Sequence, residues 1–174
     1  MCFALRVRTG SHLRAVIGII FVFLCLGAIA EDKMEQEKII RELESKDIEW
    51  LSQSEKYGYD VLDWYIKSKE VTPENLDKAF NNWKLDKSDD RAPDNIIAHG
   101  LGVLFGNYVI EHRQARWVIV TDNFGTDLAL LSPNGAEAYP ISSVWKRIDP
   151  ENEDINFFEP LYSIVINEHF SSNP

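Results

Sequence analysis

The chain has 174 residues and a formal net charge of −10, because 28 acidic residues outnumber 18 basic ones. Its length and its 45% content of hydrophobic residues suit one ordinary domain with a hydrophobic core. The negative charge argues against nucleic acid and anionic membrane surfaces as partners, since the field of such a protein repels both. A basic protein is the partner that this charge would attract.

The first thirty residues have the form of a secretory signal peptide. The first 14 residues contain three arginines, Arg6, Arg8 and Arg14, and no acidic residue. An apolar run over residues 15–30 follows them. Ala28, Ile29 and Ala30 form a small-x-small cleavage site before Glu31. We predict cleavage after Ala30 and export to a bacterial periplasm or to the exterior. The alternative is an uncleaved membrane anchor, for which 16 apolar residues are slightly short.

Removal of this segment would change the mature protein in two ways. The net charge would become −13 instead of −10, because three arginines and no acidic residue are lost. Cys2 and Cys25, which are the two cysteines of the sequence, would also be removed. The mature chain could then form no disulfide and would depend on packing for its stability. We expect no membrane association after cleavage.

The mature chain begins with a segment, residues 31–72, that we predict to be helical. Its charged residues surround an apolar stripe at helical spacing, formed by Ile40, Leu43, Ile48 and Leu51. We expect this first helix to end at Gly58, and a second, short helix to follow over residues 59–68.

Two further helices are predicted before the first strand. Thr72 followed by Pro73 is a typical helix start, with the threonine as N-cap and the proline in the first turn. The next helix, capped by Asp94 or Asn95, should run to about His112. Its small residues at four-residue spacing predict a close approach of a neighbouring backbone, with a ligand as the alternative. These are Ala98, Gly102 and Gly106.

Strands then complete a domain that we place at residues 73–174. An antiparallel meander is predicted from strands at 117–120, 127–131 and 136–139, with turn residues at 122–125 and 133–135. Residues 141–148 suit either a fourth strand or a helical turn. Residues 155–170 should be helical, with Pro160 marking a kink or the start of that helix.

This order of elements predicts an α+β fold, in which a small antiparallel sheet is covered on one face by helices. The N-terminal helices precede the sheet, and a C-terminal helix follows it. The residues expected in the shared core are Trp117, Ile119, Leu128, Leu130, Leu101, Phe105, Leu161 and Ile164.

Motifs of known catalytic chemistry are missing from the sequence. It contains no Gly-x-Ser-x-Gly elbow and no phosphate-cradling glycine-rich loop. The three histidines of the mature chain are scattered, and His99 lies about 20 Å from His112 along one helix, too far to share a metal. The acidic loop of residues 149–154 lacks the glycine pattern of a calcium loop, and Asp154 suits a helix N-cap. We predict no catalytic residue, cofactor or metal site.

Four residues remain as candidates for interactions, Asp122, Asp127, Lys146 and Arg147. The two aspartates flank the predicted hairpin turn, where close carboxylates could do acid–base work. Aspartate is also common in such turns for conformational reasons alone. The two adjacent cations would either neutralise nearby carboxylates or hold an anionic group of a partner.

A resemblance to a known family rests on three stretches, LGVLFGNYV, RWVIVTDNFGTDLAL and YPISSVWKRIDPENEDINFFEPLYSIV. They resemble a bacterial family catalogued as a domain of unknown function, number 3806, in a Leu-Gly helix, a Trp-Val strand, a turn with proline and a Lys-Arg-Ile segment. The resemblance covers about residues 73–170 and implies one α+β domain in a bacterial protein. It implies no activity, cofactor or catalytic residue.

Three functions are compatible with these features. The first is an exported, acidic binding module without catalytic activity, such as an inhibitor or immunity-type protein that neutralises a basic partner. The second is a periplasmic hydrolase that uses Asp122, Asp127 or a histidine in a cleft, and the third is a structural component of the envelope. A concave pocket with converging titratable groups would favour the enzyme, and an exposed acidic or aromatic patch would favour the binding module.

Overall fold

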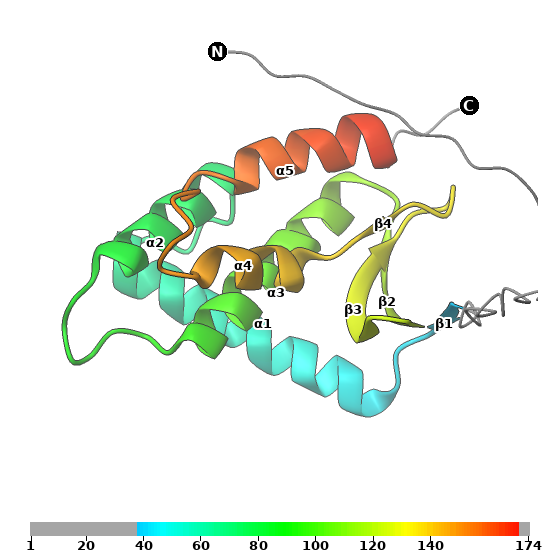
Figure 1. Cartoon of the computed structure of the whole chain (residues 1–174), viewed down its shortest axis with the longest axis horizontal. Coiled ribbons are helices and arrows are strands. Elements are labelled where there is room, and N and C mark those ends of the chain that lie inside the picture. The colour runs from blue at the N-terminus through cyan, green and yellow to red at the C-terminus, as the bar shows by residue number, and fades with distance from the viewer. Residues whose placement is uncertain (1–37, 171–174) are drawn as a thin grey trace, which may run out of the picture. The chain divides into compact units, whose positions relative to one another are not determined.

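A computed structural model describes residues 38–170 as one compact unit of five α-helices and a four-stranded antiparallel sheet (Figure 1). The predicted α+β fold is thereby confirmed. The elements are β1 (Ile39–Arg41), α1 (Ser45–Ile66), α2 (Pro73–Leu85), α3 (Asp94–His112), β2 (Arg116–Asp122), β3 (Gly125–Leu131), β4 (Glu137–Ala138), α4 (Pro140–Ile148), α5 (Phe158–Ile164) and a π-helical turn, η1 (Val165–His169).

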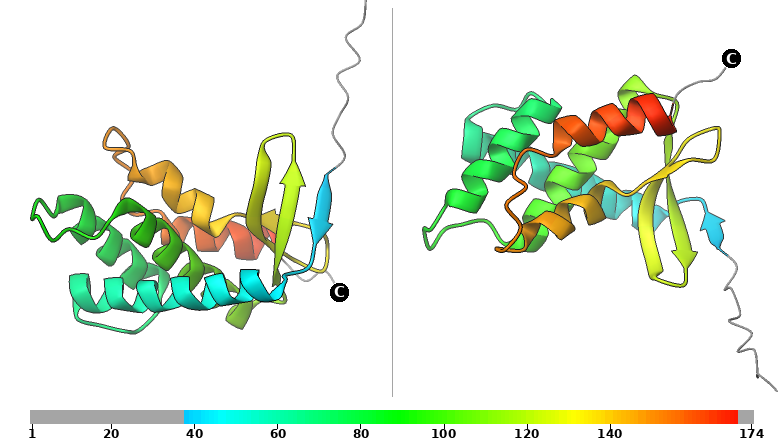
Figure 2. Two further views of the ribbon diagram at one scale, coloured as in Figure 1. Left: turned by 90° about the horizontal axis from the view of Figure 1, so that it is seen from below. Right: turned by 45° about the horizontal axis from the view of Figure 1, so that its top comes forward.

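The sheet is a meander in the order β1-β2-β3-β4, and it lies at the N-terminal end of α1 (Figure 2). The predicted hairpin is confirmed, with Asp122 paired to Gly125 across a turn in which Gly125 adopts a φ of 131°. Strand β4 pairs only with Leu130 and Leu131, so the first part of β3 is left as an open edge toward α4. Strand β1 falls in the segment predicted to be helical, and it adds a short fourth strand beside β2.

Helix α1 corrects the prediction of a break at Gly58. It continues from Ser45 to Ile66, and Gly58 lies buried in its middle because α3 crosses there. A Cβ on Gly58 would lie 2.6 Å from the carbonyl oxygen of Gly100, and a Cβ on Gly100 would lie 2.7 Å from the Gly58 nitrogen. A glycine in a helix costs about 0.5–1 kcal/mol, which the packing of two backbones in contact offsets here.

The apolar stripe of α1 also differs from the predicted one. The buried residues of α1 are Leu51, Ser54, Gly58, Val61 and Leu62, which follow one face of the continuous helix. Ile48 is 56% exposed, and Ile40 lies in β1 rather than in the helix.

Helix α3 is the central element, and it is buried on nearly all sides. The predicted close approach of a neighbouring backbone is confirmed at Gly102, whereas Gly106 faces a side chain. A Cβ on Gly102 would lie 2.7 Å from the Cα of Ile141 in α4, and one on Gly106 would lie 2.1 Å from the ring of Trp117. The helix ends at His112 as predicted, but Pro93 occupies the N-cap position, and Asp94 is the first helical residue.

The predicted start of α2 is confirmed, because the Thr72 hydroxyl accepts the backbone N–H of Asn75 at 3.1 Å and Pro73 occupies the first turn. Residues 141–148, which suit either a strand or a helical turn by sequence, are helical and belong to α4. Helix α5 begins at Phe158, so Pro160 lies in its first turn and does not kink it.

The core predicted from the sequence is largely confirmed. Trp117, Ile119, Leu130, Leu101 and Phe105 are buried, and Leu128 and Leu161 are partly buried against them. Ile164 is an exception, because its side chain is 44% exposed at the end of α5 while the next two residues, Val165 and Ile166, are buried. A smaller cluster of Val118, Val120 and Ala129 packs on the other face of the sheet with Leu131 and Tyr139.

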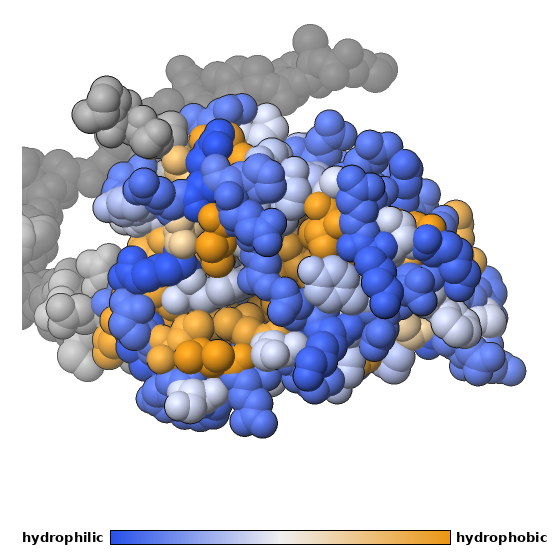
Figure 3. Space-filling model, turned by 180° about the vertical axis from the view of Figure 1, so that it is seen from behind, coloured by the Kyte–Doolittle hydropathy of each residue, from blue (hydrophilic) through white to orange (hydrophobic). Residues whose placement is uncertain are grey.

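The face of the molecule that is turned away from the viewer in Figure 1 is largely hydrophilic (Figure 3). A hydrophobic strip interrupts it at the end of the molecule that carries the sheet. Among residues 38–170 no helix combines the length and apolar character that a bilayer span requires. The signal-peptide prediction concerns residues 1–30, which lie outside the described part of the chain.

Candidate functional site

An open cleft of about 290 Å³ lies where the free edge of β3 faces α4, next to the N-terminal parts of α1 and α3. Residues of five elements, α1, α3, β2, β3 and α4, therefore line it. Its lining residues are Trp50, His99, Ile119, Thr126, Asp127, Leu128, Ile141, Ser142 and Trp145. We refer to this site as the Trp145 cleft.

Three aromatic rings form one wall of the Trp145 cleft. The His99 ring lies between two tryptophans, with ring centroids 4.9 Å from Trp50 and 6.0 Å from Trp145, both edge to face. Burial lowers the pKa of His99 below its ordinary value of 6.5, so the imidazole is uncharged at neutral pH. Trp145 keeps 42% of its surface exposed. A ligand could therefore contact this ring directly.

Asp127 supplies the carboxylate of the cleft. Its Oδ1 accepts the backbone N–H of Leu128 at 2.8 Å, and its Oδ2 accepts a short hydrogen bond from the hydroxyl of Ser142. The second bond ties the start of α4 to the open edge of β3. Within the described part of the chain, the residues that line the cleft include no lysine or arginine. None of the cations among residues 38–170 forms an ion pair with Asp127.

Asp122 lies outside this cleft, although it flanks the same hairpin turn. Its Oδ1 accepts the backbone N–H of Phe124 at 2.8 Å, which is the turn-stabilising role that aspartate commonly has. Its charge contributes, after burial and the nearby Glu137, to raising the pKa of Tyr139. The hairpin therefore does not bring Asp122 and Asp127 together in one cleft.

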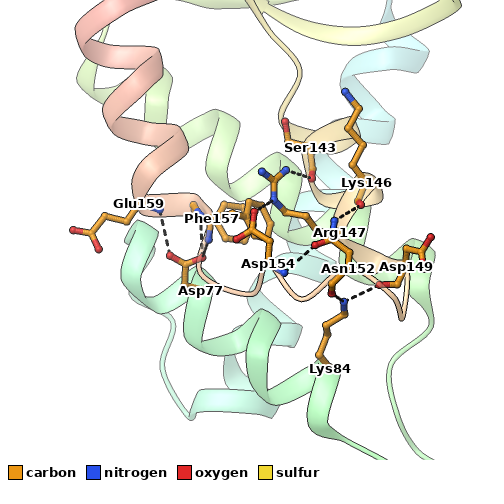
Figure 4. Close-up of polar contacts among 11 residues, drawn as sticks. Asp77, Lys84, Ser143, Lys146, Arg147, Asp149, Asn152, Asp154, Phe157 and Glu159 are labelled. Atoms are coloured by element: carbon orange, nitrogen blue, oxygen red, sulfur yellow. Dashed lines mark hydrogen bonds and ion pairs between the residues drawn. The ribbon is translucent and has the colours of Figure 1, made fainter.

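Arg147 is engaged in contacts within the chain (Figure 4). Its Nε donates to Asp154 at 2.8 Å, one of its terminal nitrogens donates to the carbonyl oxygen of Ser143 at 3.0 Å, and its guanidinium lies 4.3 Å from the ring centre of Phe157. Asp154 therefore serves as an ion-pair partner and not as the predicted helix N-cap. The ammonium group of Lys146 points away from these contacts in Figure 4.

The N-terminus of α5 is capped by a residue of α2, which sequence reasoning missed. The Asp77 carboxylate accepts the backbone N–H groups of Phe157 at 2.7 Å, Phe158 at 2.9 Å and Glu159 at 3.2 Å (Figure 4). Burial raises the pKa of Asp77, although the three N–H groups favour its charged form. Lys84 holds the loop between α4 and α5, because its ammonium group donates to the carbonyl oxygens of Asp149 at 2.9 Å and Asn152 at 2.5 Å.

Sequence reasoning named Asp127 and His99 separately but did not place them in one site. It missed Trp50, Ser142 and Trp145 altogether. A signal for two of these residues was present, because Ser142 and Trp145 are three positions apart and therefore share one face of a helix. That signal could not be used while residues 141–148 suited a strand equally well, since strand geometry would place the two residues on opposite faces.

Comparisons with known proteins give a family and a fold. Residues 73–158 match the family model described as "Domain of unknown function (DUF3806)". A crystal structure from Bacteroides thetaiotaomicron is similar, with a TM-score of 0.59 and 11% sequence identity over 80% of this chain. The chain spans 51% of that protein, so the likeness shows the fold of this part alone. A comparison with curated proteins gave no match.

Proposed function

This chain belongs to the DUF3806 family through residues 73–158, and we propose that it is an exported, acidic binding module without catalytic activity. Its concrete form is an inhibitor or immunity-type protein that recognises a basic protein. The Trp145 cleft is the recognition site, and a cationic side chain of the partner occupies it. The family segment includes the His99, Asp127, Ser142 and Trp145 positions of the cleft, whereas Trp50 precedes it.

One observation carries this proposal, namely a partly buried carboxylate without a cation beside two tryptophan rings. The electron-rich face of an indole attracts a cation, and the attraction grows when the cation is desolvated in a cleft. The Asp127 carboxylate would supply the counter-charge. Because His99 is uncharged at neutral pH, it does not oppose a positive ligand.

The charge of the whole chain supports the same partner. A net charge of −10, or −13 after removal of residues 1–30, would draw a basic protein toward the surface and speed its encounter. Salt would weaken this steering, because the Debye length falls to about 8 Å at physiological ionic strength. The cleft would then hold the partner after encounter through contacts that salt affects less.

The test is copurification of the tagged full-length protein from the envelope of its source cell. Asp127→Asn and Trp145→Ala remove the charge and the exposed ring of the cleft. Trp64→Ala is the matched control, because Trp64 is a 57% exposed tryptophan outside the cleft. We expect a basic protein to copurify with the wild type and the control, and both cleft variants to recover at least about tenfold less, as at a binding hot spot. Equal recovery by all four proteins would contradict the proposal.

A hydrolase is the second candidate, and one contact favours it. The Ser142 hydroxyl donates to Asp127, and His99 lines the same cleft, so a hydroxyl, a carboxylate and an imidazole converge there. Saturable hydrolysis of chromogenic esters that is lost in Ser142→Ala would support this function. Equal hydrolysis by the wild type and by Ser142→Ala would exclude Ser142 as the nucleophile and contradict this second candidate function.

A further inference from the structure

Resting on the proposed function, we infer that the Trp145 cleft is a guanidinium site, which recognises an arginine side chain of the partner in preference to lysine. The cleft already contains the carboxylate and the rings of an arginine site and lacks only the cation. Three independent features lead to this assignment.

The first feature is the hydrogen bonding of Asp127. An ionised carboxylate oxygen can accept two hydrogen bonds. In this structure Oδ1 accepts one from Leu128 and Oδ2 accepts one from Ser142, so one acceptor site is left on each oxygen. A guanidinium presents two parallel N–H groups that fit two adjacent carboxylate oxygens, whereas an ammonium is a point charge without this fork.

The second feature is that the chain builds the same arrangement twice within itself. The guanidinium of Arg91 lies 3.9 Å from the ring centre of Trp83 and forms an ion pair with Asp94 at 3.3 Å. Arg147 likewise stacks on Phe157 and pairs with Asp154. In both cases an arginine lies on an aromatic ring while an aspartate holds its charge.

The Trp145 cleft repeats two of these three components. Asp127 is fixed by Ser142, and Trp145 lies three positions further along α4, on the same face of that helix. The third component, the arginine, is not found among residues 38–170 that line the cleft. A partner would supply it, and the guanidinium plane would stack on the exposed ring of Trp145.

The third feature is the size of the cleft. Its volume of about 290 Å³ lies at the lower limit of the roughly 300–1,000 Å³ that sites for drug-sized ligands enclose. It therefore suits a single side chain better than an extended cofactor. Its apolar members, such as Ile119 and Leu128, would cover the aliphatic stem of an arginine while the charged end reaches Asp127.

The experiment is a calorimetric titration of the full-length protein with three small probes. N-acetyl-arginine amide is the ligand, N-acetyl-lysine amide has the charge without the fork, and N-acetyl-citrulline amide has the planar shape without the charge. We expect the arginine probe to bind at least about tenfold more tightly than either of the others. Equal binding of the arginine and lysine probes would overturn the preference for guanidinium, and equal binding of citrulline would overturn the role of charge.

Two variants assign the binding to the proposed contacts. Asp127→Asn should weaken binding of the arginine probe by about tenfold or more, because one oxygen and the charge are lost. Asp122→Asn is the matched control from the other side of the hairpin turn, and it should bind like the wild type. Equal affinity of the Asp127→Asn variant and the control would overturn the inference.

Failure of this inference is distinguishable from failure of the proposed function. One possible outcome is that no probe binds, while the Asp127→Asn and Trp145→Ala variants still fail to copurify the basic partner. In that case the cleft recognises a protein without an arginine anchor. That result overturns the guanidinium site and leaves the binding module. If copurification is also unaffected by these variants, both are overturned.

Discussion

The carboxylate of Asp77 accepts the backbone N–H of Phe157 at 2.7 Å across a separation of 80 residues in the chain. Two further N–H groups, of Phe158 and Glu159, bond to the same side chain. The first turn of α5 is thus capped by α2 and not by a residue of its own. Because the side chain of Asp77 is nearly inaccessible, with the residue 6% exposed, these N–H groups have no ready replacement from water.

Loss of this cap should destabilise the fold strongly. Asp77→Ala leaves buried N–H groups without an acceptor and should lower the free energy of unfolding by on the order of 3 kcal/mol. Asp77→Asn should cost less, because its carbonyl oxygen still accepts and because burial raises the pKa of Asp77 and so disfavours its charge. Urea unfolding of both variants measures the difference. Asp60→Ala, at an exposed position of α1, is the control; a similar loss in Asp60→Ala and Asp77→Ala would contradict the capping role.

Trp117 should be the most costly tryptophan to truncate near the sheet. Its ring fills the space beside Gly106, its Nε1 donates to Asn107 at 2.9 Å, and the residue is 7% exposed. Trp117→Ala should lower the free energy of unfolding by about 3–5 kcal/mol, as for other large core residues. The exposed Trp64→Ala should change it by less than about 0.5 kcal/mol. A loss below about 1 kcal/mol for Trp117→Ala would show that its burial contributes little.

The stability of the protein should depend on pH through His99. Burial lowers the pKa of His99 in the folded state below 6.5, the value expected in the unfolded chain. Between these two values the unfolded chain binds more protons, so the free energy of unfolding falls as the pH falls from about 6.5 through the lowered pKa. Thermal melts at about pH 7.5 and pH 5 should therefore differ less for His99→Gln than for the wild type. His112→Gln, at an exposed position, should keep the full difference.

The mature protein should begin at Glu31. Ala28 and Ala30 form the small-x-small cleavage site, and cleavage there would remove both cysteines and three arginines. The intact mass of the exported protein measures this directly. A membrane-bound species that retains residues 1–30 would contradict the prediction and would favour the anchored alternative.

Local sequence patterns predict those helices, strands and turns that are determined by residues close together in the chain. Thr72 and Pro73 marked the start of α2 because a cap and a fixed φ act within one turn. The β-branched strand and its turn predicted the β2–β3 hairpin. The glycines of α3 predicted close contact, although not that Gly106 would receive the ring of Trp117.

Features that depend on a distant element could not be predicted from such patterns. Gly58 resembles a helix break in sequence, and only the crossing with Gly100 explains why the helix continues. The cap by Asp77 joins residues of α2 and α5 that no short-range spacing relates. Prediction of the cleft would require two facts that no short-range pattern supplies. One is that α4 is a helix, and the other is that its Ser142 bonds to Asp127 on the open edge of β3.

The most direct measurement of the recognition site uses the indole N–H resonances of the five tryptophans during a titration with N-acetyl-arginine amide. Two of these residues, Trp50 and Trp145, line the cleft. The other three are reporters outside it, namely Trp64, Trp83 and Trp117. We predict saturable shifts of the Trp50 and Trp145 resonances, with the other three unchanged, and loss of those shifts in Asp127→Asn. Unchanged resonances of Trp50 and Trp145, or a larger shift of the exposed Trp64, would contradict it.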